Sequence, residues 1–350
     1  MTLPFESDVS LADFTSLGLG GPSRRFVRVD EPDALQNALA SPEAQGPVLF
    51  LAGGSNLVVS DAGFDGLTIH LGLRGIVEQG PGRIAVDAGE PWENVVEYAV
   101  SRGWAGVECL SGIPGCTGST PIQNVGAYGQ DVAQVIDCVE ALDLERGESV
   151  RLTADECEFA YRSSRFKRQR GRWLVTRVHF QLRPGGAPTV AYRELNNALD
   201  GHDADLATVR EMVLALRRSK SMVLDPDDPN TQSVGSFFTN PIVDAPAAAR
   251  VVARAVKAGI VADGSEVPSY PAGEGMTKFP AAWLIERSGI SKGMRRGNVA
   301  ISDKHTLALV HLGGGSTAEL VGLAREVQSR VQDQFGIVLE PEPTLVGVAL

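Results

Sequence analysis

Two glycine-rich stretches are the residues of this chain best suited to chemistry. Residues 112–129 contain five glycines and two prolines, and Gly53-Gly54-Ser55-Asn56-Leu57 follows an apolar run at 47–52. Peptide N–H groups in such stretches can point into a shared concavity without a Cβ atom in the way, which is the geometry that a pyrophosphate needs. Two such turns, well separated in the sequence, predict one dinucleotide that is held from two sides.

The cysteines and histidines are not spaced like a metal centre. The four cysteines include no Cys-x-x-Cys pair, and the five histidines include no His-x-x-x-His or His-Glu-x-x-His spacing. We therefore expect no metal, and we expect the cysteines to be buried thiols.

Charge and hydropathy argue against several kinds of partner. The formal net charge is -11, and the basic block at 165–170 is isolated, so the sequence predicts no nucleic-acid partner. The first residues lack the basic and apolar regions of a signal peptide, and nowhere do roughly 18 apolar residues run together. We expect a cytoplasmic protein that binds no membrane.

Short strands and few helices must position the glycine stretches. A length of 350 residues predicts two or three domains. One helix is predicted to begin near Asp30, with Pro32 in its first turn, and another is predicted over 92–102, where apolar residues recur at helical spacing before Gly103. Apolar runs predict strands at 25–29, 48–51, 67–70, 83–88, 135–144 and 173–182. The pattern indicates an α+β fold.

Helices become more frequent beyond residue 185. Apolar periodicity predicts them over 205–220, 246–258, 281–288 and 316–334. The last has a capping box, Ser316 with Glu319, and Gly336 as its stop. A polar loop at 224–234 leads into an abrupt apolar segment, which predicts a domain boundary near Asp225.

One pattern near the C-terminus imitates a dinucleotide-binding fingerprint. A predicted strand at 306–312 precedes Gly313-Gly314-Gly315-Ser316-Thr317-Ala318, a helix, and a predicted strand at 337–339 that ends at Glu340. Few residues follow Glu340 in this sequence, too few for the further parallel strands of that fold. We interpret the glycines as a tight strand-to-helix turn.

Five segments together resemble one known family. They are 52–57, 112–129, Tyr161-Arg162-Ser163-Ser164, 235–241 and 339–342. In this order and spacing they are similar to segments of the UDP-N-acetylenolpyruvoylglucosamine reductase family, and the similarity runs through nearly the whole chain. Residues 191–195 resemble the tyrosine-bearing segment of the longer form of that family.

The resemblance implies a domain order. Residues 17–185 would form an FAD-binding fold of two α+β subdomains, of the PCMH/VAO type, and 186–224 a connecting segment with a tyrosine loop and a helix. Residues 225–335 would form an α+β substrate-binding domain. Residues 336–350 would return to the active site as a C-terminal strand.

The resemblance also implies bound FAD. Its ring would lie near Gln123, Asn124, Gly126 and Ala127. No histidine precedes the first glycine turn where relatives with covalent flavin carry one, so we expect non-covalent FAD, and we interpret Cys116 as a small filler residue. The residues implied for the pyrophosphate are Gly53, Gly54, Ser55, Asn56, Leu57, Ile113, Pro114, Gly115, Thr117, Gly118 and Ser119.

The reaction implied is the NADPH-dependent reduction of UDP-N-acetylglucosamine enolpyruvate to UDP-N-acetylmuramate, a step of peptidoglycan synthesis. Hydride delivery to the alkene leaves negative charge beside a carboxylate, which the Arg162 guanidinium could neutralise with two donors. The resemblance assigns the proton to Ser236 and places Glu342 beside the arginine, where it must be protonated to help.

Substrate contacts are implied for five residues. Tyr128 would lie near the flavin and the enolpyruvyl group, and Tyr192, Lys220 and Asn240 would contact the diphosphate and uridine. Lys278 is an alternative to Lys220, because residues 221–226 depart from the commoner spacing of the family. NADPH and the substrate would use one pocket in turn, and we expect a monomer.

Other interpretations stay open at this point. Seen alone, Arg162 could be a surface arginine, Ser236 a turn cap and Glu342 an exposed acid. A flavin oxidase of the same fold is an alternative, although neither Arg162 nor Ser236 could serve as its base. A non-catalytic module that binds a nucleotide at the Gly313 turn is another.

Overall fold

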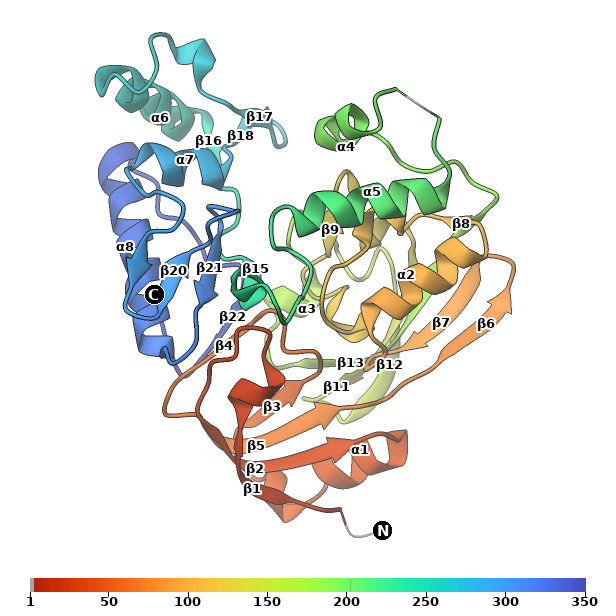
Figure 1. Cartoon of the computed structure of the whole chain (residues 1–350). Coiled ribbons are helices and arrows are strands. Elements are labelled where there is room, and N and C mark those ends of the chain that lie inside the picture. Colours follow the sequence, from red (N-terminus) through yellow and green to blue (C-terminus); the bar gives the residue numbers. More distant parts are fainter. Residues whose placement is uncertain (1–2, 202) are drawn as a thin grey trace. The chain divides into compact units, whose positions relative to one another are not determined.

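The computed structural model describes residues 3–201 and 203–350. Helices and strands are mixed along the chain, which confirms the α+β prediction (Figure 1). The residues pack as two units. The first comprises 1–9, 23–54 and 64–224, and the second comprises 10–22, 55–63 and 225–350. The chain therefore changes unit inside the first glycine turn, between Gly54 and Ser55.

A four-stranded sheet in the order β1-β2-β5-β3 begins the first unit. The three strands β2, β5 and β3 run parallel. Helix α1 (Pro32–Leu39) packs Leu35 and Ala38 against Val27 and Ile69 of the sheet. The strands are β1 (Glu6–Ser10), β2 (Pro22–Val29), β3 (Val48–Leu51) and β5 (Phe64–Leu71).

A five-stranded antiparallel sheet in the order β12-β11-β13-β7-β6 forms the second layer of this unit. Helix α2 (Trp92–Ser101) covers it, and the apolar face predicted from helical spacing is buried: Trp92 and Val96 pack with Ile84 and Phe180. The strands are β6 (Ile76–Gly80), β7 (Arg83–Asp87), β11 (Ile136–Asp143), β12 (Glu148–Thr153) and β13 (Trp173–Gln181).

The remaining elements of the first unit are short strand pairs and helices. Two short pairs are β8 (Trp104–Ala105) with β14 (Arg183–Pro184), and β9 (Gly126–Ala127) with β10 (Gln130–Asp131). Helix α5 (Leu206–Arg218) joins α2 through Arg210, whose guanidinium lies 2.7 Å from both Glu93 and Glu97. The other helices are η2 (Pro42–Ala44), η3 (Glu108–Leu110), η4 (Thr117–Ser119), η5 (Val132–Gln134), α3 (Arg165–Arg168) and α4 (Arg193–Ala198).

The second unit is built on a sheet in the order β15-β21-β20-β19. A three-stranded sheet, β16-β18-β17, and the parallel pair β22-β4 complete it. Its strands are β4 (Leu57–Val59), β15 (Ser233–Ser236), β16 (Ile242–Asp244), β17 (Tyr270–Pro271), β18 (Met276–Lys278), β19 (Arg295–Arg296), β20 (Val299–Ile301), β21 (Ala308–His311) and β22 (Thr344–Val346).

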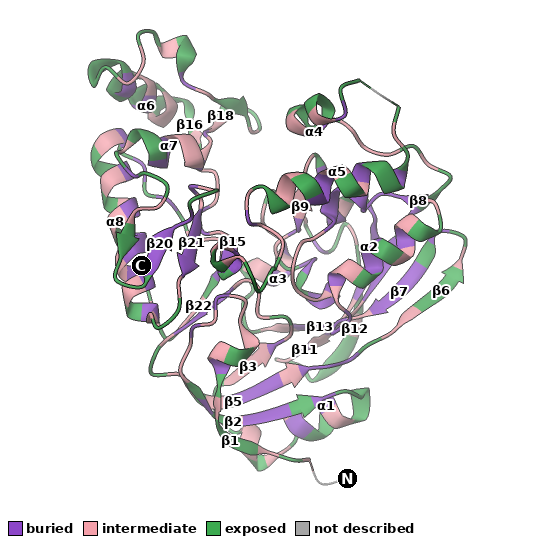
Figure 2. Ribbon diagram, in the orientation of Figure 1, coloured by how far each residue is buried: buried purple, intermediate pink, exposed green. Residues whose placement is uncertain are grey.

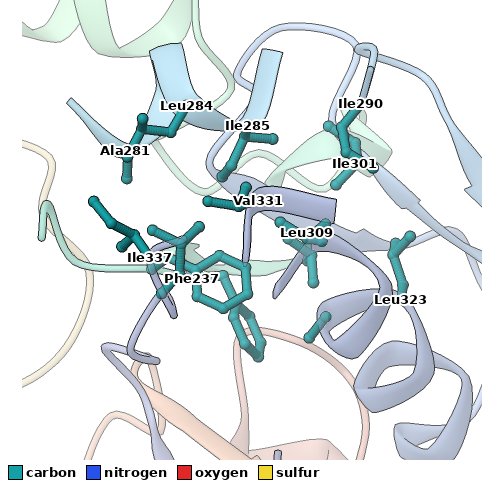
Figure 3. Close-up of a cluster of buried hydrophobic side chains, with 14 of the residues drawn as sticks. Phe237, Ala281, Leu284, Ile285, Ile290, Ile301, Leu309, Leu323, Val331 and Ile337 are labelled. Atoms are coloured by element: carbon teal, nitrogen blue, oxygen red, sulfur yellow. The ribbon is translucent and has the colours of Figure 1, made fainter. Parts of the chain in front are cut away.

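One apolar core holds this unit together. Phe237, Leu284 and Leu309 lie in it beside Val331 and Ile337 (Figure 3). Strand β20 is fully buried and β5 is half buried in their respective units, whereas helices α5 and α6 each keep one exposed face (Figure 2). The helices of this unit are η1 (Leu11–Phe14), η6 (Pro229–Thr231), α6 (Ala245–Lys257), η7 (Gly264–Glu266), α7 (Ala281–Arg287) and α8 (Thr317–Phe335).

Helix α8 has a completely capped N-terminus. The predicted capping box is present, and Gly336 ends the helix with φ 75°. In addition, the Asp61 carboxylate accepts the N–H groups of Thr317 and Ala318 at 2.7 and 2.9 Å. A side chain already fills the position where a phosphate would bind the Gly313 turn, so the structure favours the tight-turn interpretation.

The strand predicted at residues 337–339 is wrong. This segment has no regular secondary structure, and Leu339 is fully buried in the core of the second unit. Apolar burial rather than a ladder of hydrogen bonds explains its composition. The strand near the C-terminus is β22 instead, which pairs with β4 of the same unit.

We predict that Asp61→Asn lowers the free energy of unfolding by about 1–2 kcal/mol, because one of two orphan helix N–H groups then faces an amide N–H and the charge beside the helix dipole is lost. Urea unfolding followed by circular dichroism measures this. Asp65→Asn is the matched control, since Asp65 only forms an exposed ion pair with Arg24 and should change stability by less than about 0.5 kcal/mol. Equal stability of the two variants would contradict the capping role.

Candidate active site

The two glycine stretches meet by main-chain contact within the first unit. A Cβ atom on Gly53 would lie 2.7 Å from the Cα atom of Gly115, and one on Gly118 would lie 2.5 Å from the Cβ atom of Ala88. Neither position can hold a side chain without a shift of its neighbours. The local sequence is therefore glycine because two backbones must touch here.

In the second stretch, some main-chain N–H groups are hydrogen-bonded within the protein and others are not. Thr117 and Gly118 are buried, and their N–H groups bind the carbonyls of Glu90 and Ala88. By contrast, the N–H groups of Gly54, Ile113 and Gly115 donate no hydrogen bond to any described residue. These unpaired amides on touching turns, here called the cradle, can donate hydrogen bonds to an anionic group.

Residues 123–127 continue from this cradle. Asn124 has φ 46°, and its side chain is fully engaged, because Oδ1 accepts the Ala133 N–H at 3.1 Å and Nδ2 donates to the Ala160 carbonyl at 3.2 Å. Gly126 and Ala127 then form β9, paired with β10. Asn124 thus fixes the course of the loop through its side chain.

Arg162 is directed at this same loop. It lies at the tip of a two-residue turn closed by hydrogen bonds between Ala160 and Ser163, with φ 50°. Its guanidinium donates to the carbonyls of Asn124 and Gly126 at 3.3 and 2.7 Å. The positive charge therefore lies against the main chain of residues 124–126. Arg162 is half-buried, so the interpretation of it as a surface arginine is wrong.

Three of the predicted substrate residues come together in the first unit. The rings of Tyr128 and Tyr192 meet edge to face at 5.4 Å, and Lys220 Nζ lies 5.8 Å from the centre of the Tyr128 ring. Lys220 also pairs with Glu194 at 2.6 Å. Burial raises the pKa of Tyr128 to about 12, so its hydroxyl remains a hydrogen-bond donor at neutral pH.

Ser236 and Glu342 are neighbours within the second unit. Ser236 ends β15 after Gly235, whose φ is 73°, and Phe237 and Phe238 are buried immediately behind it. The Glu342 N–H donates to the Phe237 carbonyl at 2.9 Å. Ser55, Asn56 and Leu57 belong to the same unit, where Asn56 Nδ2 donates to the Glu342 carbonyl at 3.4 Å.

The two remaining predicted residues lie on adjoining elements of the second unit. Asn240 Oδ1 accepts the N–H of Ala281 at the start of α7. Lys278 lies in β18, directly between Ile242 of β16 and Tyr270 of β17. Tyr270, beside this lysine, is 56% exposed.

The described residues contain no helix long and apolar enough to cross a membrane, and no cluster of metal-ligating side chains. Cys116, in the second glycine stretch, is partly buried, and burial raises the pKa of its thiol.

Comparison with known proteins identifies the family of the chain. Residues 23–153 match the model of an FAD binding domain, so the chain is a flavoprotein. Residues 227–346 match the model of the UDP-N-acetylenolpyruvoylglucosamine reductase C-terminal domain. The chain belongs to the UDP-N-acetylenolpyruvoylglucosamine reductase family and is an FAD-dependent oxidoreductase.

Relatives of that name cover the whole chain. The one from Thermobifida fusca is 48% identical over 100% of both chains, and the one from Saccharopolyspora erythraea is 47% identical over 97% of this chain and 95% of its own. The crystal structure of the UDP-N-acetylenolpyruvylglucosamine reductase from Thermus caldophilus matches 99% of this chain and 100% of its own, with a TM-score of 0.68 and 25% identity.

We predict that Gly53→Ala weakens FAD binding by about tenfold or more, because a new Cβ would force the two turns apart at a cost of about 1–3 kcal/mol. Fluorescence titration of the apoprotein with FAD measures the affinity. Gly147→Ala is the control, since it introduces a positive-φ alanine with nothing within 4 Å of the new atom. Parent-like affinity in Gly53→Ala would show that the contact does not support the cradle.

Proposed function

We propose that this protein reduces UDP-N-acetylglucosamine enolpyruvate to UDP-N-acetylmuramate with NADPH, as a step in peptidoglycan precursor synthesis. The observation that carries the proposal is the Arg162 guanidinium held against the carbonyls of Asn124 and Gly126, in the loop that follows the glycine cradle. The family membership supplies the substrate class. We further propose that the protein acts as a monomer in the cytoplasm.

The glycine turns would hold FAD without a covalent bond. Gly53, Gly54 and the stretch 113–119 would bind the pyrophosphate, supported by the unpaired amides of Gly54, Ile113 and Gly115. Ser55, Asn56 and Leu57 continue the first turn, and Gln123 to Ala127 would lie along the ring. When bound, FAD supplies the hydride for the alkene after accepting one from NADPH.

Arg162 would neutralise the substrate carboxylate as negative charge develops on it. A planar guanidinium can give a carboxylate two parallel hydrogen bonds, which an ammonium cannot do. The left-handed backbone of Arg162 supports a special role, because a non-glycine residue adopts such a φ at some cost. Preorganisation of this kind is commonly the largest catalytic contribution.

Ser236 would give the proton to the carbon beside the carboxylate. A serine hydroxyl is a weak acid, but an enolate dianion is a strong base, so a well-placed hydroxyl can protonate it. Support comes from the rigid surroundings: Phe237 N–H binds the Leu307 carbonyl at 2.8 Å, and the two phenylalanines behind the serine are buried. Glu342, joined to Phe237 through its main chain, would add a hydrogen bond from a protonated carboxyl.

The remaining candidates would bind the nucleotide part of the substrate. Tyr128 would contact the enolpyruvyl end, and Tyr192 and Lys220 would contact the diphosphate, as their clustering in the first unit supports. In the second unit, Asn240 and Lys278 would contact the uridine and diphosphate. Lys220 pairs with Glu194 in this structure, so a diphosphate oxygen would take the place of that carboxylate on the ammonium group.

We predict that Ser236→Ala stays yellow and is reduced by NADPH at the parent rate, but returns its electrons to the enolpyruvyl nucleotide about 100-fold more slowly, a loss on the order of 3 kcal/mol. Stopped-flow absorbance separates the two half-reactions. Ser233→Ala is unsuitable as a control because Ser233 is buried, whereas Ser329→Ala changes an exposed hydroxyl on α8. Reoxidation of Ser236→Ala at the parent rate would exclude Ser236 as the proton donor.

We predict that Arg162→Lys lowers kcat/KM for the enolpyruvyl nucleotide by about 100-fold, because lysine keeps the charge but cannot make the paired donation. Steady-state NADPH oxidation measures this. Arg170→Lys, at an exposed position of the same basic stretch, should remain within about twofold of the parent. Parent kinetics in Arg162→Lys would contradict a role of the Arg162 guanidinium in catalysis.

A further inference from the structure

Glu108 is a fully buried carboxylate in the first unit whose observed partners are neutral. It accepts the Gly106 N–H at 2.7 Å, the Thr189 N–H at 2.8 Å and the Gln130 side-chain N–H at 2.7 Å. Among the described residues, no cationic side chain pairs with it. Burial of a carboxylate costs several kcal/mol unless hydrogen bonds replace water, so these three donors must be held in place.

Gln130 and Cys109 complete the network around Thr189. Gln130 Oε1 accepts the Cys109 N–H at 2.8 Å, and its Nε2 also donates to Thr189 Oγ1 at 3.0 Å. Cys109 Sγ donates to the Thr189 carbonyl at 3.2 Å, and burial raises the pKa of this thiol to about 12, which keeps the proton in place. Thr189 is thus bound through its N–H, its hydroxyl and its carbonyl.

The network joins two segments that carry candidate substrate residues. Gln130 pairs with Ala127 in the β9–β10 hairpin that contains Tyr128 at its turn. Thr189 precedes Tyr192 by three residues. Tyr192 itself is 48% exposed, so burial alone does not hold its ring against Tyr128 at 5.4 Å. The tie from Glu108 to Gln130 and Thr189 fixes the approach of the two segments.

We propose that Glu108 is a positioning residue for substrate binding, which holds the Tyr192 segment against the Tyr128 hairpin so that both tyrosines face the substrate in a fixed arrangement. Glu108 touches neither substrate nor cofactor in this role. The inference rests on the proposed function of Tyr128 and Tyr192. The inference adds that Glu108 determines the positions of Tyr128 and Tyr192.

The test is Glu108→Gln in the FAD-loaded enzyme. A glutamine places an N–H where a carboxylate oxygen accepted, so at least one of the three donors then faces another donor. We expect KM for the enolpyruvyl nucleotide to rise about tenfold or more while kcat stays within about threefold. Without substrate, we expect trypsin to cleave after the exposed Arg193 about tenfold faster, because the segment opens locally.

Two further variants make the result decisive. Glu156→Gln is the matched control, an exposed carboxylate of the same unit that accepts the Thr153 N–H and hydroxyl, and it should change neither KM nor cleavage. Thr189→Val removes only the hydroxyl that accepts from Gln130, and it should shift both readouts in the same direction by a smaller factor if Glu108→Gln folds poorly.

The outcomes separate this inference from the proposed function. Parent-like cleavage after Arg193 in both Glu108→Gln and Thr189→Val would overturn the anchoring role itself. Faster cleavage with an unchanged KM would overturn the positioning role, and would show that the Tyr192 segment does not bind the substrate. A reductase that fails to use the enolpyruvyl nucleotide in its parent form would instead contradict the proposed function.

Discussion

The contact between the backbones of Gly53 and Gly115 is the constraint on which the candidate site depends. Because no Cβ fits there, the two turns approach until their free amides can serve one anionic ligand. Hydrogen bonds of the second glycine stretch also hold the two turns close together. Thr117 and Gly118 bind carbonyls below the loop, and the Gly112 N–H donates to the Glu93 carboxylate at 2.6 Å. Binding energy can then go to the ligand rather than to ordering the loop.

The residues that follow the first glycine turn, 55–63, are held in place by other contacts, within the second unit. Leu57 to Val59 are buried in the core of the second unit and pair with β22, and the Val59 carbonyl accepts the Thr317 hydroxyl at 2.6 Å. Asp61 then caps α8. A segment of nine residues, 55–63, is thus held by a strand pair, a helix cap and apolar burial at once. The two ends of the first glycine turn are therefore each held within their own unit: Gly53 and Gly54 in the first, and Ser55 onward in the second.

Local sequence patterns predicted the regular elements well. Strands such as 48–51 and helices such as 92–102 follow from periodicity, and the capping box and Gly336 stop of α8 are local signals that the structure confirms. The strand at 337–339 was wrong, because a short apolar run is equally consistent with an unpaired buried segment. The membership of residues 10–22 and 55–63 in the second unit had no local signal, since only long-range packing decides it.

The candidate site shows the same limit more sharply. Motifs indicated the glycine turns and Arg162, but no motif indicated the contacts between segments that are distant in the sequence: Glu108 and Thr189 are 81 residues apart, and Asp61 and Thr317 are 256 apart. A lone glutamate between valine and cysteine reads as an unremarkable position. Its role appears only when its burial is known, because an enclosed carboxylate needs hydrogen-bond donors, and two of the three donors to Glu108 belong to the segments that carry Tyr128 and Tyr192. The buried Glu108 carboxylate therefore links two segments that are distant in the sequence, through Gln130 and Thr189.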